Sequence, residues 1–420
     1  DHRYLHSFPT RRSSDLAYLY AMNEFVINSF RTNRPAWDQS LVGSMADSDP
    51  LAFHQSLPGY SPTPLVSLPG LARSLGIGEI LVKDESHRLG LNAFKVLGAS
   101  WAVYRYLRAR WESETGRPFG DSLTLSPEQR THFGDLTLAT ATDGNHGRGV
   151  AWTARTLGLR AVIYMPRDTV SARIENIRRE NATVEVIDGT YDDAVEKIRD
   201  DSARHGWQII SDTSWPGYHQ IPQWIQAAYT TIFREMETAI HPPDNPGIDL
   251  VFLQGGVGAL AAGAIWYYVQ RYSPRRPRLV CLEPTDAACL LESARTSVGS
   301  MAVARGHLTS IMAGLNCGVP SAVAWPIIRD ATDLFVAIED SYARDAMRRY
   351  YHAQSGDQRI TSGESGAAGL AALLALLHAH DLAAAREYLH LGPTSRILLL
   401  NTEGATDPEG FARTVLSAGR

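Results

Sequence analysis

Short hydrophobic runs alternate with longer amphipathic segments from about residue 136 onward. The runs are rich in aliphatic and β-branched side chains and stop at glycine or polar turns, which is typical of buried strands. The segments between them carry apolar residues at helical spacing. Strands are predicted at 136–142, 160–166, 182–188, 207–212, 249–256, 278–284 and 396–404, and helices at 145–158, 171–181, 191–206, 221–240 and 259–272.

Strands that alternate with helices predict parallel sheets covered on both faces. A chain of 420 residues is long enough for two domains or one large α/β unit. We therefore predict an α/β fold of three layers with mostly parallel sheets. The longest apolar segment, 367–379, is too short to span a bilayer and predicts a buried helix.

The composition narrows the classes of function. A net charge of -5 argues against a nucleic-acid partner and against an anionic membrane surface. Three cysteines, Cys281, Cys289 and Cys317, are too few for a disulfide framework and suit a reducing cytoplasm. Whether Cys289 and Cys317 pair stays open. Histidine and cysteine do not cluster at zinc-site spacing, so no metal site is predicted.

The first sixteen residues, "DHRYLHSFPTRRSSDL", fit neither a signal peptide nor a transit peptide. Their codons match a common sequencing adapter. We interpret residues 1–16 as an assembly artefact, expect them to be disordered, and expect the natural chain to start upstream.

Two glycine-rich turns each join a predicted strand to a predicted helix. In "VFLQGGVGALAAG" (251–263), glycines and a helix N-terminus could cradle a phosphate. The structural alternative is a tight turn with close helix packing. In "ATATDGNHGRGVAW" (139–152), the turn carries Asp143, Asn145 and His146. Here the alternative is an ordinary capped helix. Two such turns in one α/β chain favour a shared ligand crevice.

Lys95 lies in the apolar stretch "GLNAFKVLG" (90–98). A buried amine must be paired, neutral or covalently used. On this stretch alone, a lysine that snorkels to water is the alternative. Together with the phosphate cradle and the asparagine turn, Lys95 predicts a pyridoxal 5′-phosphate (PLP) site with a Schiff-base lysine.

Several blocks carry a resemblance to a known family. "NAFK", "TDGNHG" and "GGVGAL" resemble the fold-type II PLP enzymes, which include tryptophan synthase β and the serine and threonine dehydratases. "KDESHRLGLNAFKVLGAS", "DTSWPGYHQIPQWI", "TSIMAGLNCG", "TSGESGAAGL" and "NTEGATDP" resemble the diaminopropionate ammonia-lyase family more closely. The blocks run from about Lys83 to Pro408, nearly the whole chain after the adapter-like segment.

The resemblance implies roles for the cofactor-binding residues. Lys95 would carry the cofactor, and Asn145 would bind its 3′-oxygen. Thr402 or its neighbour Asn401 would meet the pyridine nitrogen. The backbone of five residues would hold the phosphate: Gly255, Gly256, Val257, Gly258 and Ala259.

The resemblance also implies a domain division and an assembly. A small mobile domain, 96–203, would be inserted in a large one formed by 17–95 and 204–420. The cofactor would lie between them, and the small domain would close on the substrate. A homodimer is expected for this family.

The expected activity is the elimination of 2,3-diaminopropionate to pyruvate and two molecules of ammonia. Lys95 would remove the α-proton. The β-amine leaves well only when protonated, so Asp143 and Asp212 would bind the second ammonium group and supply its proton. If Asp143 faces Lys95 across the α-carbon, each could act as base for one enantiomer.

Two other functions remain open at this point. The nearer is a serine or threonine dehydratase, against which Asp143 argues because those enzymes usually have a small residue before the "GNH" turn. The other is a non-catalytic PLP-binding homologue. Lys95, Asp143 and Asp212 together argue against it, since such a protein needs no acid on the second face of the substrate.

Overall fold

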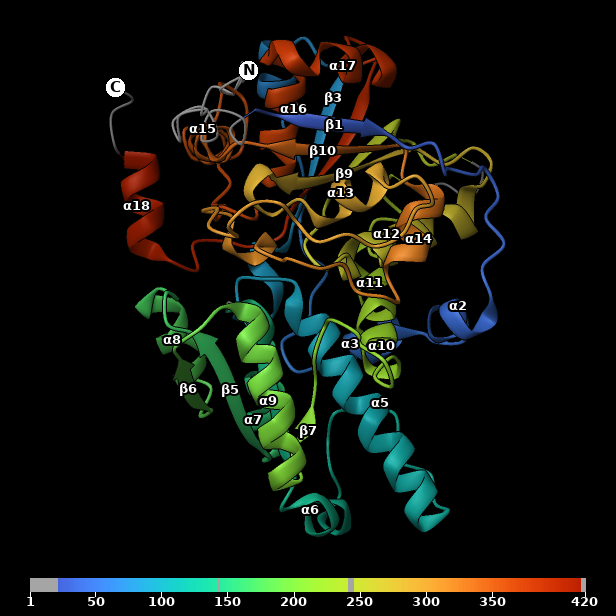
Figure 1. Cartoon of the computed structure of the whole chain (residues 1–420), viewed down its shortest axis with the longest axis vertical. Helices are drawn as coiled ribbons and strands as arrows, with labels where there is room; N and C mark the ends of the chain where they lie inside the picture. The colour runs from blue at the N-terminus through green and yellow to red at the C-terminus, as the bar shows by residue number, and fades with distance from the viewer. Residues whose placement is uncertain (1–21, 143, 241–244, 417–420) are drawn as a thin grey trace, which may run out of the picture.

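The computed structural model describes residues 22–142, 144–240 and 245–416. The adapter-like residues 1–16 and the predicted base Asp143 therefore lie outside the described residues. The described chain forms two lobes, each built on its own sheet (Figure 1). The longest described helix, α5 (Lys95–Thr115), begins where the lobes meet and runs down beside the smaller sheet.

The larger lobe is built on a seven-stranded sheet. Its five inner strands are parallel, whereas the two edge strands, β1 and β2, run antiparallel to their neighbours. The order across the sheet is β1 (Glu24–Ile27), β10 (Leu334–Ile338), β9 (Arg278–Pro284), β8 (Leu250–Gln254), β11 (Arg396–Asn401), β3 (Glu79–Asp84) and β2 (Leu65–Ser67).

Both faces of this sheet are buried because successive strand residues pack into different cores. On β8, Val251 and Leu253 join the core shared with α5, α10 and α12, while Leu250 and Phe252 join the core under α15 and α16. The helices and 3₁₀ turns of this lobe are α2 (Gln39–Ala46), α3 (Pro50–Gln55), α4 (Pro69–Leu75), η1 (Glu85–Gly90), α10 (Gln220–Ala228), α11 (Thr230–Arg234), α12 (Ala259–Tyr272), η2 (Thr285–Ala287), α13 (Cys289–Arg295), η3 (Ala313–Leu315), α14 (Trp325–Ala331), α15 (Asp340–Tyr351), α16 (Ala368–His378), η4 (His380–Leu382), α17 (Ala383–Leu389) and α18 (Pro408–Leu416).

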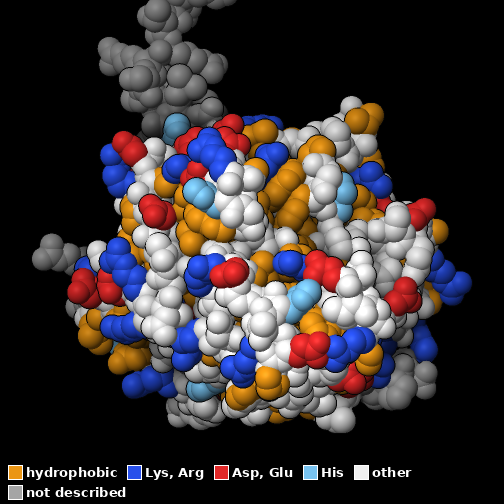
Figure 2. Space-filling model, turned by 90° about the horizontal axis from the view of Figure 1, so that it is seen from below, with side chains coloured by type: hydrophobic (Ala, Val, Ile, Leu, Met, Phe, Trp, Pro, Cys, Tyr) orange, Lys and Arg blue, Asp and Glu red, His pale blue; other side chains and the backbone are white. Residues whose placement is uncertain are grey.

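The smaller lobe is built on a four-stranded parallel sheet in the order β6 (Thr183–Ile187), β5 (Arg160–Pro166), β4 (Thr137–Ala141) and β7 (Gln208–Ile209). Its helices are α6 (Pro127–Phe133), α7 (Asn145–Leu157), α8 (Ser171–Arg178) and α9 (Tyr191–His205). Figure 2 shows basic and acidic side chains interspersed over the face at the bottom of Figure 1.

The predicted α/β class with mostly parallel sheets is confirmed. The helix predicted over 221–240 is instead two helices, α10 and α11, which meet at Tyr229. There the Thr230 hydroxyl donates to the carbonyl of Ala227 at 2.6 Å, a local bond that competes with regular helix geometry. The division into domains at 96–203 stays a prediction. The strand β7, which follows residue 203 in the chain, pairs with β4 of the smaller sheet.

The apolar segment 367–379 forms the buried helix α16, as predicted. Among the described residues, no single helix is long and apolar enough to cross a membrane. The pair 368–378 and 380–389 reaches that length only together and is bent by 88°.

Candidate active site

Lys95 opens α5 at the bottom of a cavity between the lobes. The chain reaches it through η1 and a loop in which Asn92 takes a left-handed conformation (φ 57°). Lys95 Nζ donates to Asp212 Oδ2 at 2.5 Å, and the two side chains are only 19% and 8% exposed. The predicted snorkelling alternative is therefore wrong, because the amine is paired inside the protein.

The Lys95–Asp212 pair moves the pKa values of both groups. Burial alone would lower the pKa of Lys95, but the charge of Asp212 and smaller contributions from Tyr229 and Cys317 raise it above its ordinary value. Burial would raise the pKa of Asp212, yet Lys95 and His146 lower it to about 2. At neutral pH the pair is thus an ammonium and a carboxylate.

Asp212 is held by side chains that bind the backbone directly before it. The Tyr218 hydroxyl donates to the carbonyl of Ile209 at 3.0 Å and accepts from the N–H of Ser211 at 2.9 Å. His146 Nε2 lies 2.7 Å from the carbonyl oxygen of Ile210. These bonds fix the end of β7, and with it the carboxylate, beside Lys95.

The glycine turn between β8 and α12 forms another wall of the cavity. A Cβ atom at Gly255 would lie 2.7 Å from Glu283 Cγ, and one at Gly258 would lie 2.5 Å from Ile328 Cδ1. Gly256 and Gly258 also have positive φ angles of 64° and 97°, so the turn requires glycine. The N–H of Gly255 donates to the carbonyl of Leu282 at 2.9 Å and that of Gly258 to the carbonyl of Gly255 at 3.2 Å, while the helical bonds of α12 begin with the N–H of Ala262. Within the turn, the N–H groups that can face an anion are therefore those of Gly256, Val257 and Ala259.

Of the five predicted phosphate-binding residues, four line the cavity: Gly255, Gly256, Val257 and Ala259. Gly258 is the exception and lies behind them as the N-cap of α12. The close packing expected of a tight turn is present here, and the phosphate cradle stays a prediction.

Asn145 begins α7 on the smaller lobe and lines the same cavity. Its Nδ2 donates to Glu403 Oε2 at 2.5 Å, across the gap between the lobes. The capped-helix alternative is also supported: Gly144 is the N-cap residue, and the Thr142 hydroxyl before it accepts from the first-turn N–H of Gly147 at 3.1 Å. The cap and the placement of Asn145 in the cavity therefore occur together.

Of the two candidates for the pyridine nitrogen, Thr402 and Asn401, the structure places only one in the cavity. Thr402 lines the cavity and is 4% exposed. Asn401 instead turns its amide to Asp84 Oδ1 at 2.7 Å and to the carbonyl of Thr361 at 3.2 Å. Neighbouring strand residues point to opposite faces, so only Thr402 is placed to meet a ring in the cavity.

The cavity thus brings together every described residue of the predicted site except Gly258. It is also lined by residues that the sequence reasoning missed: Arg173, Tyr191, Gly314, Cys317, Ser365 and Glu403. A signal existed for four of them, since they lie in blocks that carry the family resemblance: Gly314, Cys317, Ser365 and Glu403.

The three cysteines all fall in the described part of the chain and are thiols. Cys289 Sγ donates to the carbonyl of Gly256 at 3.5 Å, while Cys317 lines the cavity. Cys289 and Cys317 therefore flank the glycine turn without forming a disulfide.

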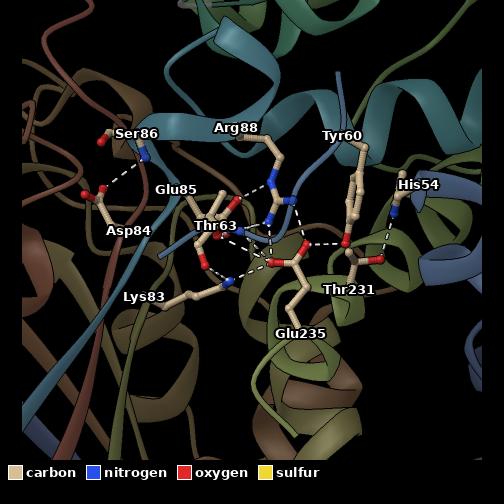
Figure 3. A network of polar contacts seen from close by, with 10 residues as sticks. All are labelled: His54, Tyr60, Thr63, Lys83, Asp84, Glu85, Ser86, Arg88, Thr231 and Glu235. Carbon is tan, nitrogen blue, oxygen red and sulfur yellow. Dashed lines mark hydrogen bonds and ion pairs between the residues drawn. The ribbon is translucent and has the colours of Figure 1, made fainter. Parts of the chain in front are cut away.

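A buried network of ion pairs lies beside η1, the segment that precedes Lys95 (Figure 3). Glu235 accepts from Lys83 Nζ at 2.6 Å and from Arg88 Nη1 at 2.7 Å. Arg88 also donates to both oxygens of Glu85 at 2.8 Å. The four side chains are at most 1% exposed. The network joins α11 to β3 and η1 and so supports the loop that carries Lys95.

Comparison with known proteins places these features in a family. The pyridoxal-phosphate dependent enzyme family matches residues 57–400. A diaminopropionate ammonia-lyase of Salmonella typhimurium is 39% identical over 396 residues, which is 92% of this chain and 97% of the relative.

Solved structures agree with that comparison. Diaminopropionate ammonia-lyase from Escherichia coli, in complex with an aminoacrylate–PLP azomethine reaction intermediate, superposes with a TM-score of 0.80. It is 37% identical, and the match covers 94% of this chain and 97% of that one. The same enzyme in complex with D-serine has a TM-score of 0.80 and 36% identity.

Proposed function

The chain belongs to the pyridoxal-phosphate dependent enzyme family, and we propose that it is a carbon–nitrogen lyase that uses water to convert 2,3-diaminopropionate to pyruvate and two molecules of ammonia. The observation that carries this proposal is the buried Lys95–Asp212 pair beside a glycine cradle. Its nearly full-length similarity to diaminopropionate ammonia-lyases supports the choice of substrate.

The residues of the cavity fit PLP. Lys95 supplies the amine, Gly256, Val257 and Ala259 offer backbone N–H groups, and Asn145 and Thr402 offer polar contacts for the ring. A Cβ atom at Gly255 or Gly258 would collide with its neighbours, so the turn can approach a phosphate only with glycine at these positions. When bound, PLP withdraws electrons from the α-carbon of the amino acid.

Lys95 and Asp212 then form a short proton path. Lys95 Nζ takes the α-proton from the substrate once it has given up its own extra proton. Asp212 Oδ2, 2.5 Å away, stabilises the ammonium that Lys95 becomes when it takes this proton. The leaving β-amine needs a proton, and this pair is placed to provide it. A carboxylate here also favours a diamino acid, because serine would leave a buried charge unpaired.

Asp143 is proposed as the second base, on the face of the substrate opposite Lys95. This assignment rests on the family resemblance, since Asp143 lies outside the described residues. Two bases on opposite faces would let the enzyme use both D- and L-diaminopropionate.

The decisive experiment measures pyruvate and ammonia from the purified protein with D- and L-diaminopropionate, serine and threonine. We expect two ammonia per pyruvate from diaminopropionate and a much higher kcat/KM than with either hydroxy amino acid. A higher kcat/KM with serine or threonine, at one ammonia per keto acid, would favour a dehydratase and overturn the proposal.

Closure of the smaller lobe over the substrate is also proposed. Besides the Asn145–Glu403 bond, two contacts from α8 join the lobes beside the cavity. Arg173 Nη2 lies 4.0 Å from Glu364 Oε2, and Asn176 Nδ2 donates to the carbonyl of Thr406 at 3.1 Å. Such contacts on α8 would tighten as the lobes approach.

We propose further that the protein is a cytoplasmic homodimer. Its cysteines are thiols, and apolar side chains gather on the loop after α13, where Val298, Met301 and Val303 are 75%, 44% and 65% exposed. An exposed apolar group of this kind is typical of an interface. Light scattering should give twice the chain mass, and Val298→Asp with Val303→Asp should lower it; a monomeric wild-type protein would contradict the proposal.

A further inference from the structure

Glu403 is a buried carboxylate that directly follows Thr402 and lines the cavity. It is only 1% exposed. Within the described ranges, no lysine, arginine or histidine lies within ion-pair distance of it. A buried carboxylate usually forms an ion pair or has a functional role, so the contacts of Glu403 indicate its role.

Three groups donate to Glu403. Asn145 Nδ2 lies 2.5 Å from Oε2, the Thr406 hydroxyl lies 3.3 Å from the same oxygen, and the N–H of Ser365 lies 3.2 Å from Oε1. The last two donors belong to the larger lobe and hold the carboxylate in place. Asn145 comes from the smaller lobe, 258 positions away in the chain.

The contact with Glu403 determines which way the Asn145 amide points. A carboxylate only accepts hydrogen bonds, whereas an asparagine amide has an oxygen at one end and two N–H groups at the other. The nitrogen end of Asn145 must therefore face Glu403. One N–H is used in that bond, and the other remains available to a second acceptor nearby.

We propose that Glu403 is a positioning residue that fixes the Asn145 amide so that its second N–H meets the 3′-oxygen of the cofactor. The inference rests on the cofactor site assigned under the proposed function. Glu403 also links the two ring contacts, since it follows Thr402 in sequence and binds Asn145 directly. A flipped amide would turn its oxygen to the 3′-oxygen, where two acceptors would repel each other.

The test uses cofactor binding, so it does not depend on which amino acid the enzyme consumes. Apoprotein is titrated with PLP, and Kd and the visible absorbance maximum are recorded for wild type, Glu403→Ala, Glu403→Gln, Asn145→Ala and the double variant Asn145→Ala/Glu403→Ala. Glu180→Gln is the matched control. Glu180 is buried and pairs with Arg148 and Arg155 on the same helix as Asn145, but it does not contact the amide.

Glu403→Ala should raise the PLP Kd by about tenfold to a hundredfold, the range for a hydrogen bond to a charged group, and shift the absorbance maximum. Glu403→Gln should recover much of the loss, because its amide oxygen still accepts from Asn145. Glu180→Gln should leave both readouts near wild type. In the Asn145→Ala background, Glu403→Ala should add no further loss, because the residue acts through Asn145.

Fully additive losses in the double variant would overturn the inference, as would an unchanged Kd and spectrum in Glu403→Ala. An unchanged cofactor Kd with a raised KM for diaminopropionate alone would mean that Glu403 binds the substrate ammonium instead. Thermal unfolding of each apoprotein identifies a folding defect, and Glu403→Gln keeps the test valid if Glu403→Ala does not fold. Failure of the proposed elimination would leave these binding results unaffected.

Discussion

At the scale of single residues, Lys95 and Asp212 carry the proposed chemistry, and each depends on the other. The amine is held as an ammonium by a carboxylate at 2.5 Å, so it can act as a base only after it has lost its extra proton. We propose that Asp212 has a part in the reaction, since it stabilises the charge that Lys95 gains when it takes the α-proton.

Replacing Lys95 with alanine should abolish pyruvate formation and the visible absorbance band of covalently held PLP, because no other amine lines the described part of the cavity. A loss of at least about a thousandfold in kcat is expected for the removal of a nucleophile and base. Absorbance spectra of reconstituted protein provide the measurement. Lys197→Ala, which removes a half-exposed lysine paired with Asp201, serves as control and should keep the band.

Asp143→Asn should damage turnover of D-diaminopropionate far more than turnover of the L-isomer. If Asp143 serves one face and Lys95 the other, only one enantiomer loses its base, and the loss should be on the order of a hundredfold or more. Steady-state kcat with each pure isomer provides the measurement. Similar losses on both isomers would show that the two-base arrangement is wrong.

The sequence predicted the parts of the cavity that short motifs encode, namely Lys95, Asn145 and the glycine turn. Each of these lies in a short motif whose spacing sets its geometry. The choice between Thr402 and Asn401 could not be made, because it depends on which strand face meets the cavity. The Asn145–Glu403 bond joins residues 258 positions apart, and the pattern along the chain contains no signal for such a pair.

At the scale of elements, the buried network in Figure 3 sets how firmly η1 holds the Lys95 loop. Burial would raise the pKa of Glu235, but Arg88 and Lys83 together lower it to about 2. A carboxyl with a depressed pKa stabilises the fold above its ordinary value of 4.5, and this contribution is lost as the pH falls from there towards 2.

Glu235→Gln should therefore destabilise the apoprotein by about 3–5 kcal/mol at pH 7, the range for leaving buried charges without their partner. Chemical unfolding followed by circular dichroism provides the measurement. The difference in unfolding free energy between wild type and variant should become smaller as the pH falls below 4.5. Glu237→Gln, at a side chain 28% exposed and paired with Arg271, should change stability by less than about 1 kcal/mol. If that difference in unfolding free energy did not change with pH, the stabilising role of the ionised Glu235 would be contradicted.

Element prediction was limited where packing decides the structure. The strand β10, "LFVAI", is entirely buried, and a short apolar run of this kind cannot be told from a buried helix by periodicity. The edge strands β1 and β2 are only four and three residues long and show little alternation. The single helix expected over 221–240 breaks at Tyr229, where a local hydroxyl bond rather than glycine or proline ends it.

At the scale of the whole molecule, the site is a cavity between two lobes, and both lobes contribute residues to it. The glycine turn, Thr402 and Glu403 come from the seven-stranded side, whereas Asn145 and Asp212 come from the four-stranded side or its end. A cofactor in this cavity would contact both lobes, so its binding should stabilise the packing of the two lobes against each other as well as the cavity itself.

Removal of PLP should therefore lower the stability of the folded protein. At a free concentration a hundred times Kd, bound cofactor adds about 2.7 kcal/mol through mass action alone. Calorimetry with and without PLP measures this, and hydrogen exchange should show added protection in both α7 and the 255–262 segment. Lys95→Ala should reduce the stabilisation, because covalent attachment is lost while the cradle remains. Protection confined to one lobe would mean that the cofactor does not hold the two together.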